Sequence, residues 1–373
     1  MTEIVKSSDG AAAISRWRTI YDSLLARIES GELAAGVTLP TEVDLAAEWG
    51  VSRLTAHRAL YELARSGIVV RKRKVGTVVL PFADRPSMPV SIAGLFFETS
   101  DYFQGNYLSC LRNSLSDDVH LVYVDTGHDP MRENHMLRRM QKECQGMVLF
   151  ATCAPENDQL LGKIVKSGFP LVFVDRYPAN MDCDSVSTDN YNTTRQAIRT
   201  LQQAGHRAIA HITDNEMNVT SVRDRFNGYR DEMEEAGLFD RSLVRLLPYI
   251  APVCEAEYEQ MIQLVQDALV AMRHGSNPPT AVFCLRDHLT GAVCEAANRI
   301  GIRIPEDLEV LGYNERPNWL LKLPDGLWTI QQNVAEIAAL AAQRVRARLG
   351  GEQIPFEHVL VPGRLIGPGL GSD

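Results

Sequence analysis

From residue 91 onward, short apolar runs alternate with amphipathic stretches of helical spacing. The apolar runs have the length of buried strands, and they recur about every 25 residues. They cover residues 91–97, 121–124, 147–150, 171–174, 208–212, 243–247, 281–285 and 308–312. This alternation predicts an α/β fold in which helices cover both faces of parallel sheets. Because the rhythm occurs twice in tandem, we expect two lobes with a ligand cleft at the carboxyl ends of the strands.

The first 80 residues follow a different pattern. Apolar residues recur at helical spacing from Trp17, and Gly31 is a stop signal. Thr41 is placed to cap a second helix that ends at Gly50. Residues 1–13 lack apolar periodicity, so they are the one segment expected to be disordered.

A third helix is expected to follow at once, with Ser52 as its cap. We expect this helix to bury Leu54, Ala59, Leu60 and Leu63. Two short strands at 68–70 and 75–80 then predict a hairpin. Two helices joined by a tight turn and followed by a hairpin predict a winged helix-turn-helix over residues 14–80.

Charge supports a nucleic-acid partner for this domain. Residues 53–74 hold seven Lys or Arg residues and one acid, whereas the whole chain carries a net charge of -9. Neutralising phosphates is the commonest reason for a local cationic excess in an acidic protein. The residues proposed to contact double-stranded operator DNA are Thr41, Glu42, Arg53, Thr55, His57, Arg58, Arg71, Lys72, Arg73, Lys74 and Gly76.

This segment resembles the winged helix of the gluconate-repressor (GntR) family. The resemblance is carried by residues 28–33 (IESGEL), 39–42 (LPTE), 51–53 (VSR), 58–60 (RAL) and 76–77 (GT). It implies that Arg53, Thr55 and His57 contact bases and that Glu42 orients a neighbouring arginine. It also implies that Gly76 lets the wing approach the DNA backbone. The family usually has glycine where this chain has Lys74.

Residues 81–90 contain three prolines and predict a semi-stiff linker to a sensor domain over 91–373. In that domain, polar or aromatic residues that follow the strands are candidates for binding a small effector. They are Phe97, Tyr102, Phe103, Asp175, Arg176, Arg223, Asp287 and Asn314. Asp175 and Asp287 could instead cap the following turns, and Arg225 is expected to be an internal salt-bridge partner.

The second domain resembles the sensor of lactose-repressor (LacI) type regulators, which is similar to periplasmic sugar-binding proteins. The resemblance is carried by residues 168–176 (GFPLVFVDR), 223–229 (RDRFNGY), 310–314 (VLGYN) and 329–332 (TIQQ), among others. It implies effector contacts from Asp175 or Arg176, Arg223, Asp287, Asn314 and Gln332. Arg286 stands where asparagine is usual, which would favour an acidic or phosphorylated effector. The two domains together resemble the arabinose-repressor subgroup.

These patterns predict a cytoplasmic transcriptional regulator, most simply a repressor, that binds DNA as a homodimer. An enzyme and a solute-binding α/β protein with an accessory nucleic-acid-binding domain are the alternatives. No phosphate loop, nucleophile elbow or zinc-protease motif occurs in the sequence, so neither catalysis, a cofactor nor a metal is expected. No apolar stretch is long enough to span a membrane, and the seven scattered cysteines predict buried, reduced thiols.

Overall fold

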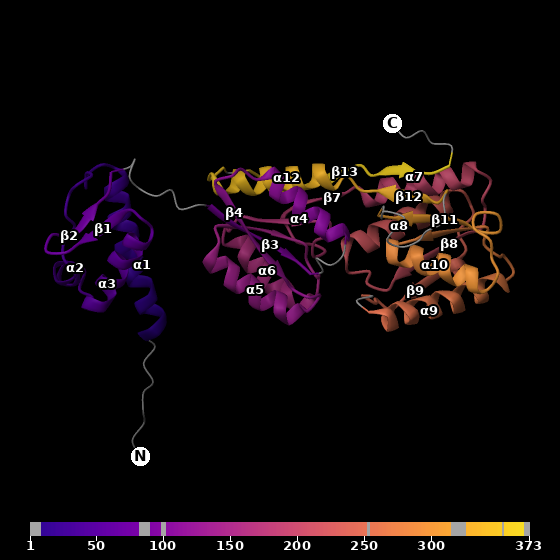
Figure 1. Cartoon of the computed structure of the whole chain (residues 1–373), viewed down its shortest axis with the longest axis horizontal. Coiled ribbons are helices and arrows are strands. Elements are labelled where there is room, and N and C mark those ends of the chain that lie inside the picture. The colour runs from indigo at the N-terminus through magenta and orange to yellow at the C-terminus, as the bar shows by residue number, and fades with distance from the viewer. Residues whose placement is uncertain are drawn as a thin grey trace, which may run out of the picture. The chain divides into compact units, whose positions relative to one another are not determined.

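A computed structural model describes residues 9–81, 90–97, 102–251, 254–314, 326–352 and 354–368, with side chains from Arg16 onward. The chain divides into two compact units, Met1–Pro89 and Val90–Asp373, and each is described by itself (Figure 1). Most of the expected linker, residues 82–89, lies outside the described residues.

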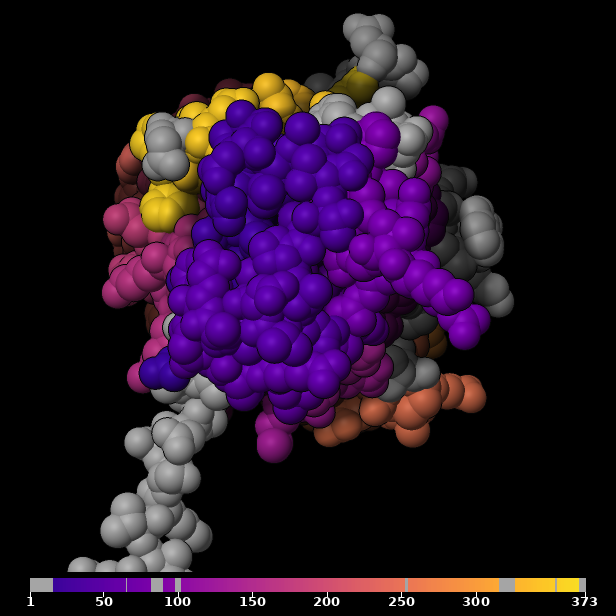
Figure 2. All heavy atoms as spheres, turned by 90° about the vertical axis from the view of Figure 1, so that its left-hand side faces the viewer, coloured from indigo at the N-terminus to yellow at the C-terminus, as the bar shows by residue number. Residues whose placement is uncertain are grey.

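The first unit packs three helices against a small hairpin, and Figure 2 shows its described atoms, indigo to violet, as one closely packed body. Its elements are α1 (Asp9–Glu29), α2 (Glu42–Trp49), α3 (Arg53–Arg65), β1 (Val69–Lys72) and β2 (Gly76–Val79). The core takes one apolar face from each helix, including Ile20, Leu24, Leu45, Leu60 and Leu63. The segment before α2 pairs with β2, where the Leu39 amide donates to the Thr77 carbonyl at 2.8 Å.

Two sequence predictions for this unit were wrong. Disorder was expected for residues 1–13; residues 1–8 lie outside the described residues, but helix α1 begins at Asp9. Residues 11–13 are alanines, which have the highest helix propensity. Leu54 was expected to be buried, but it is 75% exposed. In α3 the core face passes through Ala56, Ala59 and Leu60, and a residue two positions before Ala56 lies on the opposite side of the helix.

The first lobe of the second unit contains a six-stranded parallel sheet in the order β13-β7-β6-β5-β3-β4. Its strands are β3 (Val90–Phe96), β4 (Val119–Asp125), β5 (Gly146–Leu149), β6 (Leu171–Val174), β7 (Asp184–Thr188) and β13 (His358–Val361). Helices α4 (Tyr102–Ser114) and α12 (Val334–Leu349) pack on one face, and α5 (Pro130–Glu143) and α6 (Pro155–Lys166) pack on the other. The predicted parallel α/β layers are therefore confirmed for this lobe.

The second lobe repeats this arrangement in the order β14-β12-β11-β10-β8-β9, with β14 antiparallel to β12. Its strands are β8 (Ile209–Asp214), β9 (Val244–Leu247), β10 (Ala281–Cys284), β11 (Glu309–Tyr313), β12 (Trp328–Gln331) and β14 (Arg364–Ile366). A short helix, η2 (Arg241–Leu243), precedes β9. Helices α7 (Asn190–Gln203) and α8 (Thr220–Glu235) cover one face, and α9 (Glu255–Arg273) and α10 (Asp287–Arg299) cover the other.

The sequence suggested two lobes strictly in tandem, but the chain interleaves them. After β12 the chain returns to the first lobe for α12 and β13, and it then enters the second lobe again for β14 (Figure 1). The chain therefore passes between the lobes near Asp189, Gln332 and Gly363. Three connections at one boundary limit how the lobes can move relative to each other, and they favour a hinge.

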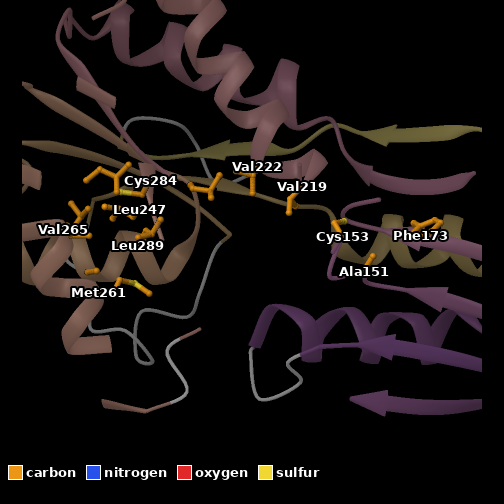
Figure 3. Close-up of a cluster of buried hydrophobic side chains, with 14 of the residues drawn as sticks. Ala151, Cys153, Phe173, Val219, Val222, Leu247, Met261, Val265, Cys284 and Leu289 are labelled. Carbon is orange, nitrogen blue, oxygen red and sulfur yellow. The ribbon is translucent and has the colours of Figure 1, made fainter. Parts of the chain in front are cut away.

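Buried apolar side chains also join the lobes. One core cluster contains Ala151 and Cys153 of the first lobe together with Val219 and Val222 of the second, and Figure 3 shows Val219 beside Cys153. Polar bonds accompany this contact, because Asn218 Nδ2 donates to the Cys153 carbonyl at 3.0 Å. The start of α8 is thus anchored to the first lobe.

Candidate functional site

The two helices of the helix-turn-helix begin at well-formed caps. Thr41 accepts a hydrogen bond from the Asp44 amide, and the Asp44 carboxylate accepts one from the Thr41 amide at 3.0 Å. Ser52 caps α3 by accepting from the Thr55 amide at 3.2 Å, and the hydroxyls of Ser52 and Thr55 lie 2.8 Å apart. Thr41 therefore stabilises the start of α2 as a helix cap, and Ser52 does the same for α3.

Glu42 connects α2, α3 and the wing. Its carboxylate oxygens lie 2.7 Å from His57 Nδ1, 3.3 Å from Arg53 Nε and 3.5 Å from Arg71 Nη2. The hydrogen bond with His57 is the largest cause that lowers the pKa of Glu42. The resemblance to the GntR family implied that Glu42 orients one arginine, whereas the structure brings two arginines and a histidine to this carboxylate. The side chain of Arg53 stays 74% exposed, so it can still reach a base or a phosphate.

Two residues of α3, Arg58 and Leu54, lie differently from what the sequence predicted. The Arg58 guanidinium lies 4.9 Å from the centre of the Trp17 ring, a cation–π distance, so its side chain packs toward α1. Leu54, which was not among the proposed DNA contacts, is exposed next to Arg53. An exposed apolar side chain at the start of a recognition helix is suited to contact a thymine methyl group.

The wing presents the four cations Arg71, Lys72, Arg73 and Lys74, all exposed. Lys74 has φ 67°, the left-handed conformation that the glycine usual in the family adopts readily. Gly76 has φ 114°, and a Cβ atom there would lie 2.9 Å from Thr38 Cγ2. The structure thus gives Gly76 an intramolecular reason to be glycine, apart from any approach to DNA.

In the second unit, a small cavity of about 60 Å³ lies where the two lobes meet. We call it the inner cavity. Its described lining residues come from the ends of β6, β8, β10 and β11, from the first turns of α4, α8 and α10, and from the segments that follow β3, β5, β8 and β9. They are Phe97, Phe103, Gln104, Phe150, Asp175, Arg176, Asp214, Glu216, Ser221, Val222, Arg225, Tyr249, Leu285, Arg286, Asp287, His288 and Asn314.

The guanidinium groups of the inner cavity are paired with carboxylates inside it. Arg176 Nε donates to Asp175 Oδ2 at 2.9 Å, and Arg286 Nε donates to Asp214 Oδ2 at 2.8 Å. Arg225 Nη2 lies 3.9 Å from the other oxygen of Asp175. With Glu216 and Asp287 as the remaining carboxylates, the cavity holds no excess of positive charge.

Hydrogen-bonding capacity nevertheless remains for a ligand. Asp175 Oδ1 is buried and accepts no hydrogen bond from the described residues. Burial raises the pKa of Glu216, whose carboxylate also lines the cavity. Acceptors next to guanidinium donors are the combination that vicinal hydroxyl groups require.

An aromatic stack crosses from one lobe to the other beside the cavity. His128, which follows β4, stacks on Tyr249, which follows β9, with ring centres 4.5 Å apart and planes 12° apart. Phe97 meets His128 edge-on with ring centres 4.5 Å apart, and Arg286 lies 4.9 Å from the centre of the Tyr249 ring. Burial lowers the pKa of His128 to about 4, and Arg176 adds to this effect. We call the His128–Tyr249 pair the interlobe stack.

A second, more open hollow of about 370 Å³ adjoins the inner cavity, and both are lined by Phe103 and Asn314. We call it the outer hollow. Its other described lining residues are Tyr102, Asn106, Gln331, Gln332 and Val334. Gln332 bonds to both Thr188 and Asn314, so it ties together two places where the chain changes lobe.

The predicted effector residues therefore fall into three groups. Phe97, Phe103, Asp175, Arg176, Asp287 and Asn314 line the inner cavity, and Tyr102 and Gln332 line the outer hollow. Arg223 lines neither; its side chain is 37% exposed and donates to Asp224 at 3.1 Å. Arg225 is the internal salt-bridge partner that was expected, with Nη2 3.9 Å from Asp175 Oδ1. It also lines the inner cavity, where it donates to the Leu285 carbonyl at 2.9 Å.

The sequence predictions missed several lining residues, including Asp214, Glu216, Tyr249 and Phe150. Asp214, Tyr249 and Phe150 end or follow strands β8, β9 and β5, so the same strand-end rule could have found them. Glu216 lies in the loop before α8, where no local signal distinguishes it.

The sequence predictions about metal ions, membrane spans and cysteines can be compared with the described residues. Within the described ranges there is no group of three or more His, Cys, Asp or Glu side chains that could hold a metal ion. No described helix is long and apolar enough to cross a membrane. All seven thiols are unpaired; four are buried, but Cys254 is exposed and Cys110 and Cys294 are half-buried, so full burial was too strong a prediction.

Comparisons with known proteins match both units. Residues 17–79 match the bacterial regulatory proteins of the gntR family, and residues 198–367 match the periplasmic binding protein-like domain. The HTH-type transcriptional regulator DegA of Bacillus subtilis is 23% identical over 87% of this chain and 96% of its own length. The arabinose metabolism transcriptional repressor of Geobacillus stearothermophilus is 22% identical over 81% of this chain and 82% of its own length.

Solved structures share the fold of the second unit. The transcription regulator CcpA of Lactococcus lactis superposes with a TM-score of 0.64 and 18% identity, over 74% of this chain and 97% of that chain. At this identity the similarity shows the fold alone, namely two lobes with parallel sheets and a cleft between them.

Proposed function

The chain is a DNA-binding transcriptional regulator that joins a GntR-type winged helix to a periplasmic-binding-protein-like domain, and we propose that it is a repressor controlled by a neutral, polyhydroxylated effector. The observation that carries the proposal is one chain with two candidate sites: the cations of the winged helix gathered around Glu42, and a polar cavity between two lobes. Relatives named as regulators and repressors support it, and nothing in them favours an enzyme.

The paired charges of the inner cavity support the neutral class of effector. An anionic ligand would compete with Asp175 and Asp214 for guanidiniums that they already neutralise. A sugar hydroxyl can donate to Asp175 Oδ1 and accept from a guanidinium without adding charge. We therefore set aside the acidic or phosphorylated effector that Arg286 suggested, and the name of the arabinose repressor agrees with a sugar.

We also propose that the protein binds operator DNA as a homodimer, joined through the edge strands of its sensor domain. Strands β4 and β9 end their sheets, and Val122 and Leu246 on them are 36% and 41% exposed. Edge strands with exposed apolar side chains are suited to pairing with another chain. Two winged helices at a fixed spacing would add their binding free energies on a two-fold symmetric operator.

Thermal denaturation with matched ligands tests the effector class. A ligand that binds only the folded state raises the apparent stability in proportion to the logarithm of its concentration over Kd. We expect at least one neutral sugar, screened among pentoses, hexoses and disaccharides, to raise the Tm more than its aldonic acid or its phosphate. A larger shift with the acid or the phosphate would contradict the neutral class.

A further inference from the structure

Exposed cations gather at one edge of the first lobe of the sensor domain. They lie in the C-terminal halves of α5 and α6 and are Arg138, Arg139, Lys142, Lys163 and Lys166. We propose that these five residues, the edge cluster, form a second DNA-binding surface that contacts phosphates outside the base pairs read by the winged helix. The inference rests on the DNA-binding function of the chain, and it does not depend on the identity of the effector.

The charge of the edge cluster is opposite to that of its domain. Residues 90–373 carry 26 Lys or Arg residues and 37 Asp or Glu residues. Within the cluster only Arg139 has a carboxylate partner, with Nε 2.9 Å from Glu143 Oε1. Arg138 Nε donates to the Asn134 amide oxygen at 3.0 Å, and neither Arg138 nor the three lysines form an ion pair with any described residue. Their charge is therefore available to a partner.

Other arginines of the domain are already neutralised. Arg286 lies 2.8 Å from Asp214, and Arg199 lies 2.8 Å from Glu232. An unpaired group of cations in an acidic domain of a DNA-binding protein is the electrostatic pattern that neutralises phosphates. Charge complementarity thus favours duplex DNA as the occupant of the edge cluster.

Helix stability accounts for only part of the cluster. The three lysines lie in the last turns of α5 and α6, where cations stabilise the negative end of the helix dipole. Arg138 and Arg139 lie a turn or more before Glu143, the last residue of α5. Because the effect of the dipole falls off within the last turn, it gives no reason for the two arginines.

The cluster lies at the edge of the sheet where the linker enters the sensor domain. Helix α5 leads into β5 and α6 leads into β6, and the parallel strands β3, β5 and β6 are neighbours in the sheet. The register pairs Ile92 of β3 with Gly146, and Met147 with Leu171. The ends of both helices therefore share one edge with Val90, where β3 begins after the linker.

This position makes weak phosphate contacts effective. Once the winged helix holds DNA, a surface joined to it by the ten residues 81–90 meets the same duplex intramolecularly, at an effective concentration of roughly mM. Each phosphate contact releases a counterion and adds affinity without base preference. The edge cluster should therefore strengthen the binding of any DNA sequence and increase its salt dependence.

Neutral double variants test the cluster in the full chain. Arg138→Gln with Lys142→Gln removes two cations from α5, and Lys163→Gln with Lys166→Gln removes two from α6. These side chains are exposed, and glutamine has nearly the helix propensity of arginine and lysine, so both variants should fold. Thermal unfolding checks this.

The second lobe offers a matched control with the same change in net charge. Arg207 and Arg241 are exposed and lie just before β8 and β9, at the corresponding edge of the other sheet. Arg207→Gln with Arg241→Gln should leave DNA binding unchanged. Lys74→Ala is the positive control, because losing one phosphate contact of the wing should lower the slope of log affinity against log salt by roughly one.

The probe is a mixed-sequence duplex of about four helical turns, roughly 40 base pairs, and fluorescence anisotropy measures its affinity. Each cluster variant should lower the slope by roughly 1 to 2, so that between about 50 and 200 mM salt it loses about four- to sixteenfold less affinity than the wild type. The Arg207 and Arg241 control should keep the wild-type slope.

Two results would overturn the second DNA-binding surface. Wild-type slopes in both cluster variants, while Lys74→Ala lowers the slope, would show that the cluster does not contact DNA and would point to an acidic protein as its partner. An equal decrease in the Arg207 and Arg241 control would show an effect of net charge rather than a contact. If the wild type does not bind the duplex at all, the DNA-binding function fails together with this inference.

Discussion

At the scale of single residues, Arg53 and Lys74 should contribute to DNA binding in different ways. Glu42 aims Arg53 from the start of α3, whereas Lys74 is exposed at the wing tip. Arg53→Ala should weaken operator binding by about 1 to 3 kcal/mol and relax sequence preference, because a bidentate base contact is lost. Lys74→Ala should weaken all sequences alike and lower the slope of log affinity against log salt by roughly one. Fluorescence anisotropy with operator and scrambled duplexes measures both, and unchanged affinity in both variants would refute the assignment.

Arg225 and Arg223 provide a second residue-scale test. Arg225 lies 3.6 Å from the centre of the Tyr313 ring and donates to Asn190 and Leu285, whereas Arg223 is partly exposed beside Asp224. Lysine keeps the charge at 225 but cannot form the same forked contacts, so Arg225→Lys should lower effector affinity roughly tenfold or more. Arg223→Ala should stay within twofold of the wild type. Calorimetric titration with the effector measures both affinities. A larger loss for Arg223→Ala than for Arg225→Lys would show that the effector binds outside the inner cavity.

The sequence could have separated these two arginines. Val222, Arg225, Tyr229 and Glu232 are all buried on α8, and their spacing marks the inner face of a helix. Arg223 lies off that face. The strand-end rule, by contrast, correctly brought Asp175, Arg176, Asp287 and Asn314 to one cavity because the carboxyl ends of parallel strands share an edge.

At the scale of elements, the loop after β4 carries a test of pH dependence. The pKa of His128 is about 4 in the folded protein and about 6.5 when exposed, so the unfolded chain binds more protons between these values. The neutral His128 side chain therefore contributes its full share to the free energy of unfolding above pH 6.5, and this share is lost as the pH falls toward 4. Between pH 7 and pH 5 the loss should be roughly 1 to 2 kcal/mol.

The variant His128→Asn isolates this contribution, because asparagine tolerates the φ of 54° at this position. His211, which is buried and also has a pKa of about 4, remains in the variant and acts as a constant background. Urea unfolding at the two pH values should show a smaller pH effect in the variant. An equal pH effect would mean that the interlobe stack does not hold His128 neutral.

One strand could not be predicted because its residues are mostly polar in sequence but buried in the fold. Strand β7 reads DSVST, and all five residues are buried. Its polar groups find partners far along the chain: Asp184 binds Arg344 and Arg348, and Ser185 Oγ lies 2.7 Å from His358 Nδ1. A search for apolar runs cannot find such a strand. The return of α12 and β13 to the first lobe was missed for another reason: both are largely apolar, but the spacing of apolar residues does not show which lobe an element joins.

At the scale of the whole molecule, the proposed dimer can be disrupted at the sheet edges. Val122→Glu combined with Leu246→Glu places charges on the exposed faces of β4 and β9, where burial against a second copy would be costly. The double variant should be monomeric and should bind operator far more weakly, with its thermal stability nearly unchanged. Met131→Glu, at a position on α5 that is 83% exposed, is the control. Light scattering measures the mass, and a dimeric double variant would place the interface elsewhere.

Effector binding and operator binding should be coupled within one molecule. Linkage requires that if the effector lowers operator affinity by some factor, the operator lowers effector affinity by the same factor. The most direct measurement is calorimetric titration of the stabilising sugar into the full chain, alone and saturated with operator duplex. We expect the operator to weaken sugar binding by a factor of about 5 to 150, matched by the weakening of operator binding that saturating sugar causes. A sugar affinity that is the same with and without operator would contradict the account.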